Sequence, residues 1–311
     1  MAKHRAGDRR IISISVPEEL AQRLDKVVGK GKDKGRSATI AKMIEQSLTP
    51  KKPVDNSKKG TSNVKVKTGI RVESDTMGDL EVPADRYYGC QTARSLINFD
   101  IGDDKMPRGV IRAFGVLKQA AAKTNVALKQ LDPEVGKLVI RACQEVIDGD
   151  LDDHFPLRIW QTGSGTQSNM NTNEVIANLA SKKLGETVSP NDDVNMSQSS
   201  NDTIPTAICI SALLDMEELL LPGLDILIKE MDTKAKKLKG TIKTGRTHLM
   251  DAMPIDFAQE ISGWSAQLKS CKNAVIAANK RMLDLPQGGT AIGTGVNSHK
   301  NFSKSFCEAV E

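Results

Sequence analysis

Apolar residues recur at helical spacing through most of the chain. From 106 to 128, and again from 132 to 147, they return every three or four positions, with a proline near each expected helix start. Two longer patterns of the same kind run from about 206 to 238 and from about 255 to 285. Helices of about thirty residues exceed the usual length and are typical of a bundle whose members cross a whole subunit. The pattern therefore predicts a mainly α protein.

The first fifty residues follow a different pattern. Residues 12–16 (Ile-Ser-Ile-Ser-Val) alternate between apolar and polar, as in a half-buried strand, and two short amphipathic helical patterns follow. One strand and two short helices cannot bury their own apolar faces, so a unit of about 40 residues normally needs an oligomer. Residues 49–63 are rich in Pro, Lys, Ser, Asn and Gly. This composition predicts a flexible linker.

Charge separates the same two parts of the chain. Residues 1–60, the basic head, hold 15 Lys and Arg against 7 Asp and Glu. The whole chain carries +5, so the excess of +8 in the head leaves −3 for residues 61–311. Clustered cations are the usual electrostatic footprint of polyanion binding, although a solvated basic tail has the same composition.

Composition narrows the class of protein. Hydrophobic residues make up 39%, charged residues 27% and aromatic residues only 3%, a balance typical of a globular helical protein. The most apolar stretch, 208–228, contains four carboxylates, too many for a membrane span, and residues 1–10 lack the apolar core of a secretion signal. Five scattered cysteines without a Cys-x-x-Cys pair argue against a disulfide framework and a zinc site. We therefore expect a cytoplasmic protein.

Three polar loops between the helical patterns carry candidate chemistry. The first is TGSGT at 162–166, followed by QSNMNTNE, and we expect a helix to begin near Glu174. The second is NMSQSSND at 195–202, and the third is GRTHLMD at 245–251, which places a His beside a Thr at an expected loop–helix junction. Hydroxyls, amides and unpaired backbone N–H groups at a helix start can hold a carboxylate or a phosphate. Singly, each loop is more often a turn or a helix cap, but three in one scaffold favour a site.

These segments resemble the class II fumarate hydratases of the fumarase/aspartase superfamily. The resemblance runs from about 71 to 311 and rests on GSGTQSNMNTNEVIAN, SPNDDVNMSQSSND, KTGRTHLMDAMP, FAQEISGW and GGTAIGTG. The aspartase-like pattern would have Gly-Ala-Gly-Thr-Ser, Ser-Thr-Asn-Asp and Gly-Arg-Thr-Gln in the three loops, so Ser164, Ser200 and His248 agree with fumarase. The resemblance implies reversible hydration of fumarate to L-malate, with no metal or organic cofactor. An aspartase-like ammonia lyase is the alternative.

The resemblance also implies roles for individual residues. His248 corresponds to the catalytic histidine that handles the proton of the leaving water, and imidazole suits this task because it titrates near neutral pH. A hydrogen-bonded structural histidine is the alternative. The family's secondary dicarboxylate site begins His-Pro-Asn-Asp, whereas Ser189, Asn191 and Asp192 occupy it here without the imidazole. The substrate-binding positions are Ser164, Thr166, Ser199, Ser200, Asn201 and Thr247.

In the family, each site is assembled from loops of three subunits of a tetramer, which implies a homo-oligomer. The family chain also continues past the equivalent of residue 311 to a loop, Gly-Ser-Ser-x-Met-Pro-x-Lys-x-Asn, that supplies a Ser as general base. We therefore expect activity to need a separately encoded C-terminal fragment, or the chain to be an incomplete gene product. The alternative is a catalytically dead, oligomeric DNA-binding regulator. The resemblance divides the chain into a fumarase-like N-terminal domain at 67–204 and an incomplete central helical bundle at 205–311.

The strand–helix–helix order of residues 1–50 resembles the ribbon-helix-helix DNA-binding family, and 51–66 would be the linker. In that family two chains pair their strands into a ribbon that enters the major groove of DNA. The resemblance places Ser13 and Ser15 toward the groove and Ser37, at the start of the second helix, near a DNA phosphate. A dimerisation unit without a DNA role is the alternative.

Overall fold

The computed structural model describes residues 69–310. The chain divides into two units, Met1–Lys65 and Val66–Glu311, and the described residues belong to the second. The predicted ribbon-helix-helix unit (1–50), with Ser13, Ser15 and Ser37, and the predicted linker (51–66) lie outside the described residues.

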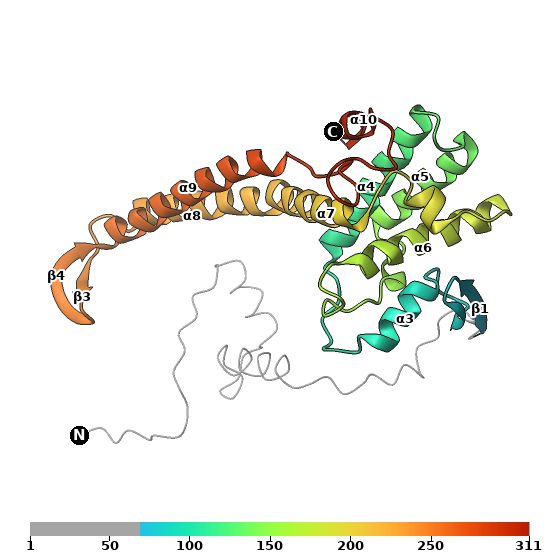
Figure 1. Cartoon of the computed structure of the whole chain (residues 1–311). Helices are drawn as coiled ribbons and strands as arrows, with labels where there is room; N and C mark the ends of the chain where they lie inside the picture. Colours follow the sequence, from blue (N-terminus) through green and yellow to red (C-terminus); the bar gives the residue numbers. More distant parts are fainter. Residues whose placement is uncertain (1–68, 311) are drawn as a thin grey trace, which may run out of the picture. The chain divides into compact units, whose positions relative to one another are not determined.

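The second unit is mainly helical, which confirms the predicted fold class (Figure 1). It opens with an antiparallel hairpin, β1 (Ile70–Asp75) and β2 (Gly78–Pro83). The helices and helical turns follow in chain order: α3 (Cys90–Asn98), α4 (Arg108–Ala127), α5 (Pro133–Asp148), η2 (Asp152–His154), α6 (Thr166–Leu184), η3 (Pro190–Val194), α7 (Ser200–Asp215), η4 (Met216–Leu220), α8 (Leu221–Lys237), α9 (Phe257–Met282) and α10 (Phe302–Val310).

Helices α4 and α5 confirm the two shorter helical predictions to within two residues. Pro107 directly precedes α4, and Pro133 is the first residue of α5, where a missing N–H costs nothing. The carboxylate of Asp132 caps α5 by accepting hydrogen bonds from the N–H groups of Glu134 and Val135. Gly149 ends the helix at φ 92°, a left-handed conformation that glycine adopts without a steric penalty.

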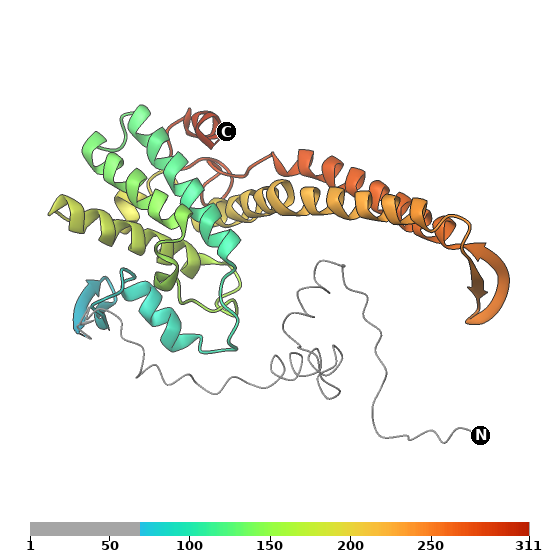
Figure 2. The same ribbon diagram turned by 180° about the vertical axis from the view of Figure 1, so that it is seen from behind.

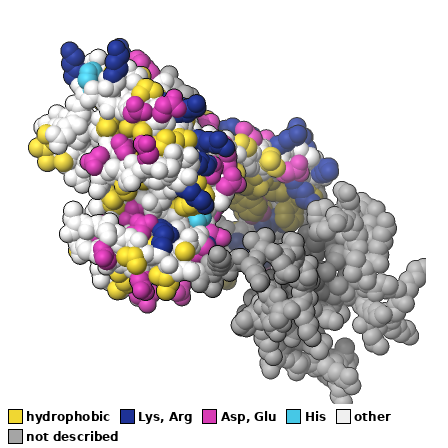
Figure 3. Space-filling view, turned by 90° about the vertical axis from the view of Figure 1, so that its right-hand side faces the viewer, with side chains coloured by type: hydrophobic (Ala, Val, Ile, Leu, Met, Phe, Trp, Pro, Cys, Tyr) yellow, Lys and Arg dark blue, Asp and Glu magenta, His cyan; other side chains and the backbone are white. Residues whose placement is uncertain are grey.

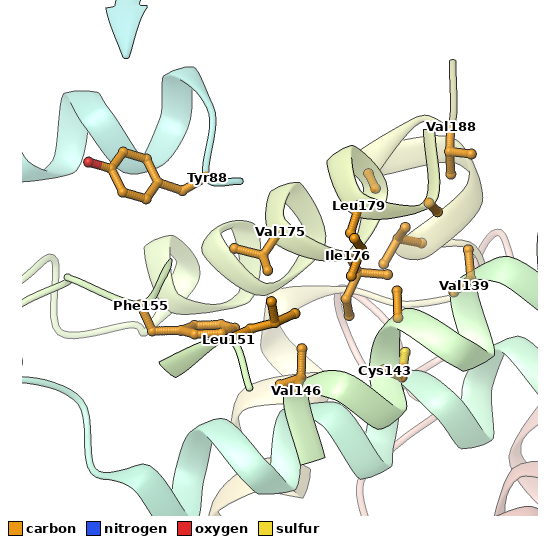
Figure 4. Packing of buried hydrophobic residues seen from close by; sticks show 14 of the residues in the cluster. Tyr88, Val139, Cys143, Val146, Leu151, Phe155, Val175, Ile176, Leu179 and Val188 are labelled. Carbon is orange, nitrogen blue, oxygen red and sulfur yellow. The ribbon is translucent and has the colours of Figure 1, made fainter. Parts of the chain in front are cut away.

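The larger core lies between α5 and α6. Val139, Cys143 and Val146 of α5 face Val175 and Ile176 of α6, and all five side chains are buried (Figure 4). A second cluster joins α4, α7 and the short α10. Its buried members are Ala113, Phe114, Leu117, Ala120, Ala121, Ala207, Ile210, Phe302 and Phe306. These two clusters fix the starts of α6 and α7 relative to each other.

An arm, residues 216–282, projects from this body (Figures 1 and 2). Helix α7 continues through the π-helical turn η4 into α8, so one helical run extends from 200 to 237, about six residues earlier than predicted. At about 1.5 Å per residue the run is roughly 55 Å long. Helix α9 returns beside α8, where Asp232 accepts hydrogen bonds from Ser265 (2.6 Å) and Lys269 (2.8 Å). Among the described residues, no helix is both long enough and apolar enough to cross a bilayer.

The far end of the arm is a β-hairpin that the sequence did not predict. Its strands are β3 (Ile242–Thr247) and β4 (Met250–Asp256), which pair antiparallel. His248 and Leu249 form the two-residue turn at φ 51° and 60°, the conformation that matches the twist of a hairpin. The prediction of a loop–helix junction at 245–251 is therefore wrong, because α9 begins only at Phe257.

Candidate active site

Helix α6 begins at Thr166, so the prediction of a helix start near Glu174 is wrong. Residues 167–173 are almost all polar, and such residues usually indicate a loop. Here Asn169, Thr172 and Asn173 are buried in the helix, where their side chains hydrogen bond inside the body. Glu174 lies about two turns after the helix start, in the middle of α6.

The Glu174 carboxylate is buried and caps another helix. It accepts hydrogen bonds from the N–H groups of Gly89, Gln91 and Thr92 and from the Thr92 hydroxyl, all at the start of α3. Burial raises the pKa of Glu174, while these donors oppose the shift. The residue therefore ties α3 to α6 and belongs to the scaffold of the site.

The first polar loop turns sharply into α6. Gly163 and Gly165 have φ of 81° and 73°, and the exposed hydroxyl of Ser164 lies 2.9 Å from that of Thr162 and 3.0 Å from that of Thr166. A Cβ atom at Gly165 would lie 2.6 Å from Cδ1 of Ile204 on α7. The turn thus packs directly on the first turns of α7, with its hydroxyls at the start of α6, where unpaired N–H groups favour an anion.

The second polar loop ends in the first turn of α7. Ser199 is the N-cap, and it forms a capping box with Asp202. Ser200 is the first helical residue, and its hydroxyl lies 3.4 Å from the Asn169 amide of α6. The exposed Asn201 donates a 2.7 Å hydrogen bond to the Ala291 carbonyl, which belongs to the GGTAIGTG segment. The predicted segments 162–166 and 199–201 therefore adjoin each other. Segment 199–201 also adjoins 288–295, which carries the resemblance but was not predicted to belong to the site.

Asp202 joins the last two of these segments, and sequence reasoning missed it. Its buried carboxylate accepts hydrogen bonds from the N–H groups of Ser199 (2.9 Å), Gly288 (3.0 Å) and Thr290 (2.8 Å). The available signal was the Ser-x-x-Asp spacing of a capping box at 199–202.

The third polar loop lies elsewhere in the same chain. Thr247 and His248 are exposed at the tip of the arm, while the starts of α6 and α7 lie in the body (Figures 1 and 2). The helical run between them is roughly 55 Å long. One chain therefore brings together Ser164, Thr166, Ser199, Ser200 and Asn201, and does not bring Thr247 and His248 to them.

The predicted secondary site lines an open cavity of about 420 Å³. Asn191 and Asp192 form one wall, and the cavity continues to Ser199 and Thr290. Ser189 is used locally: its hydroxyl donates to the Asp192 carboxylate at 2.9 Å and accepts from the Asp192 N–H at 3.0 Å. Among the described residues, no Lys or Arg lines this cavity. A dicarboxylate there would meet mainly neutral amides and hydroxyls.

A buried lysine lies behind the wall of this cavity and was also missed. Lys118 of α4 donates hydrogen bonds to the side-chain oxygens of Asn195 (2.9 Å) and Gln198 (3.0 Å), which both line the cavity. It is completely buried, and burial lowers its pKa to about 7. The signal was its place in the apolar stripe of α4, four residues after Phe114 and three before Ala121.

Within residues 69–310, no group of three or more His, Cys, Asp or Glu side chains has the geometry to hold a metal ion. All five cysteines lie in this range and are free thiols.

The fold is that of a family of lyases. The family described as Lyase matches residues 78–311, and the chain belongs to it. More particularly, the chain is similar to class II fumarate hydratases. It is 51% identical over 246 residues to that of Brucella suis biovar 1, covering 77% of this chain and 53% of the relative. It is 52% identical over 241 residues to that of Thermus thermophilus, covering 75% and 52%.

A solved class II fumarase structure is also similar to this chain. The crystal structure of recombinant class II fumarase from Schistosoma mansoni superposes with a TM-score of 0.75 at 41% identity, covering 78% of this chain and 52% of that one. The chain thus spans about half the length of the curated relatives it matches.

Proposed function

We propose that this chain takes part in the reversible hydration of fumarate to L-malate, as one component of a class II fumarate hydratase. The observation that carries the proposal is the junction of two hydroxyl-rich helix starts, at Ser164–Thr166 and at Ser199–Asn201. Neutral hydrogen-bond donors and two helix N-termini suit a small dicarboxylate, because they stabilise the negative charge of both carboxylates without transferring a proton to them. The similarity to fumarate hydratases favours hydration over ammonia elimination.

Each side chain has a task in this proposal. Ser164, Thr166, Ser200 and Asn201 bind the carboxylates, and the N–H groups nearby stabilise the charge that builds on one carboxylate as the intermediate forms. In the dehydration direction, a base removes a proton from carbon, and His248 donates a proton to the departing hydroxyl as it leaves as water. Thr247 binds substrate beside it.

His248 reaches the other residues only from a second copy of the chain. Its hairpin is exposed, with Leu249 98% exposed, and apolar side chains such as Ile226 and Trp264 are exposed along the arm. Further apolar side chains lie exposed among charged ones on the face of the body seen in Figure 3. Uncovered apolar surface of this kind favours association. We therefore infer a homo-oligomer in which the arm of one chain serves the body of another.

The general base is assigned to the family's Gly-Ser-Ser-x-Met-Pro-x-Lys-x-Asn loop, which residues 1–311 do not contain. A positioned base typically contributes about 10²–10⁴-fold to the rate, so the donors of this chain cannot replace it.

The test follows fumarate formation from L-malate by ultraviolet absorbance. We expect the purified chain to be inactive alone and active after addition of the C-terminal half of a class II fumarate hydratase, and the variant His248→Asn to be inactive in both. Activity of residues 1–311 alone would contradict the need for that loop. Inactivity with the added half would contradict the function.

We further propose that residues 1–50 bind DNA, which rests on their sequence pattern and basic charge. Retention of a peptide of these residues on duplex DNA should fall steeply as salt rises, because phosphate contacts release counterions. Retention that is absent at low salt would favour a dimerisation unit.

A further inference from the structure

Lys118 is an unusual residue to find in a protein core. Its side chain has no exposed surface, and within residues 69–310 both of its hydrogen-bond acceptors are side-chain amide oxygens. Burying an ammonium group beside neutral acceptors is unfavourable for folding. The acceptors, Asn195 and Gln198, belong to the loop between η3 and α7. The lysine therefore supports that loop from behind.

The contacts of Lys118 extend to the proposed substrate positions. Asn195 Oδ1, which accepts from Lys118, also accepts from Nδ2 of Asn169 and of Asn173, each at 3.2 Å. Asn169 Nδ2 in turn lies 3.4 Å from the Ser200 hydroxyl. The ammonium is thus linked through two amide side chains to a residue that binds substrate in the proposed function.

The pKa of Lys118 depends on the groups that the elements packed around α4 place near it. Helix α5 contributes the Cys143 thiol and α7 contributes Asp202, while α6 contributes neutral amides and α10 the rings of Phe302 and Phe306. Burial lowers the pKa of Lys118 to about 7, and the charge of Asp202 opposes the shift. Burial raises the pKa of Cys143 to about 12, so its thiol is neutral in this range. The lysine therefore changes charge in the neutral range, where an exposed lysine does not.

We propose that Lys118 is a positioning residue of the dicarboxylate site: its ammonium holds loop 195–199 in the shape that presents Ser199 and Ser200, and its charge behind the cavity wall favours a bound dianion. The dianion part rests on the proposed function. A protonated amine donates stronger hydrogen bonds than a neutral one. When the loop alone opens, Lys118 stays buried in the body and loses both acceptors, so the loop is held most firmly while the lysine is protonated. Complete unfolding solvates the ammonium and therefore has the opposite pH dependence.

Amide hydrogen exchange of the full chain tests the positioning role without any substrate. Protection factors of residues 195–199, corrected for the intrinsic pH dependence of exchange, are followed from about pH 6 to about pH 8.5. We expect them to fall about tenfold in the wild type, the difference between a charge-assisted and a neutral hydrogen bond. In Lys118→Met, the protection factors of residues 195–199 should be low at both ends of this pH range. Lys123→Met, the same change on the exposed face of α4, is the matched control and should follow the wild type.

A second variant covers the case in which Lys118→Met does not fold. Gln198→Glu keeps the shape of the side chain and gives the ammonium a carboxylate partner. An adjacent opposite charge favours the charged form, so the pH at which the loop loosens should rise by more than about one unit. An unchanged profile in Gln198→Glu, or full protection in Lys118→Met, would overturn the inference.

Calorimetric titration with L-malate separates this inference from the proposed function. The chain is tested with the same C-terminal fumarase half. Weaker binding by Lys118→Met near pH 6, by about tenfold, and equal binding near pH 8.5 support the inference. Equal binding at both pH values with an unchanged loop overturns it and leaves the proposed function intact. If the wild type binds no L-malate while its loop follows the expected profile, the positioning role stands and the dianion role fails.

Discussion

The Asp202 carboxylate accepts a 2.8 Å hydrogen bond from the N–H of Thr290, which lies 88 residues further along the chain. The same carboxylate binds the N–H groups of Ser199 and Gly288, so one buried side chain connects the start of α7 to the segment that follows α9. A carboxylate that accepts several N–H hydrogen bonds holds the backbone in place more strongly than a neutral acceptor does.

We predict that Asp202→Asn lowers the free energy of unfolding by about 2–3 kcal/mol, because an amide offers a single acceptor oxygen to buried N–H groups. Urea denaturation measures the change. Asp192→Asn, at an exposed position, is the control and should stay within about 0.5 kcal/mol of the wild type. Equal effects at the two positions would show that Asp202 does not connect the segments.

Gly165 and Gly163 form a matched pair for testing the close approach of α6 to α7. Both have positive φ, so alanine costs about 1–2 kcal/mol at either position. Only at Gly165 would the new Cβ meet another residue, Ile204, whereas Gly163 has no atom within 4 Å of that point. We expect Gly165→Ala to be more destabilising than Gly163→Ala by about 1–3 kcal/mol in thermal or urea unfolding. Equal losses would mean that the helix starts are not in contact.

Mixing two inactive variants tests the division of the site between chains. Ser164→Ala changes only the body and His248→Asn changes only the arm. In a random mixed oligomer, some sites therefore combine an unchanged body with an unchanged arm. If each site takes Ser164 and His248 from two different chains, about a quarter of wild-type activity should return. The measurement is fumarate formation in the preparation that contains the C-terminal half. A mixture that stays inactive would place both residues in one chain's site.

The stability of the fold should depend on Lys118 above neutral pH. Its pKa is about 7 in the folded chain and that of an ordinary lysine in the unfolded chain, so between these values the unfolded state binds one more proton. The free energy of unfolding should therefore rise with pH, by up to ~1.4 kcal/mol per unit. Urea denaturation of the wild type and of Lys118→Met between about pH 7 and pH 9 isolates this contribution, since other groups cancel. Parallel curves would contradict a neutral-range lysine.

Periodicity predicted the helices whose apolar face is regular, and the polar segments were harder. Helices α4 and α5 agree with the pattern because their buried residues are apolar. The start of α6 was missed because Asn169 and Asn173 are buried amides, which resemble loop residues until their partners are known. Loop residues of the candidate site could be named from the resemblance, and their distribution between body and arm could not. That distribution depends on the length of the helical run between the second and third polar loops. The two sequence motifs alone do not give the distance between them in space.

The length of the run from 200 to 237 has a consequence for the proposed reaction. A chain that holds its histidine far from its own pocket has no catalytic capacity as an isolated molecule, however well it is folded. Activity per chain should then fall on dilution, as the oligomer dissociates. It should be lost at protein concentrations at which each chain is still folded.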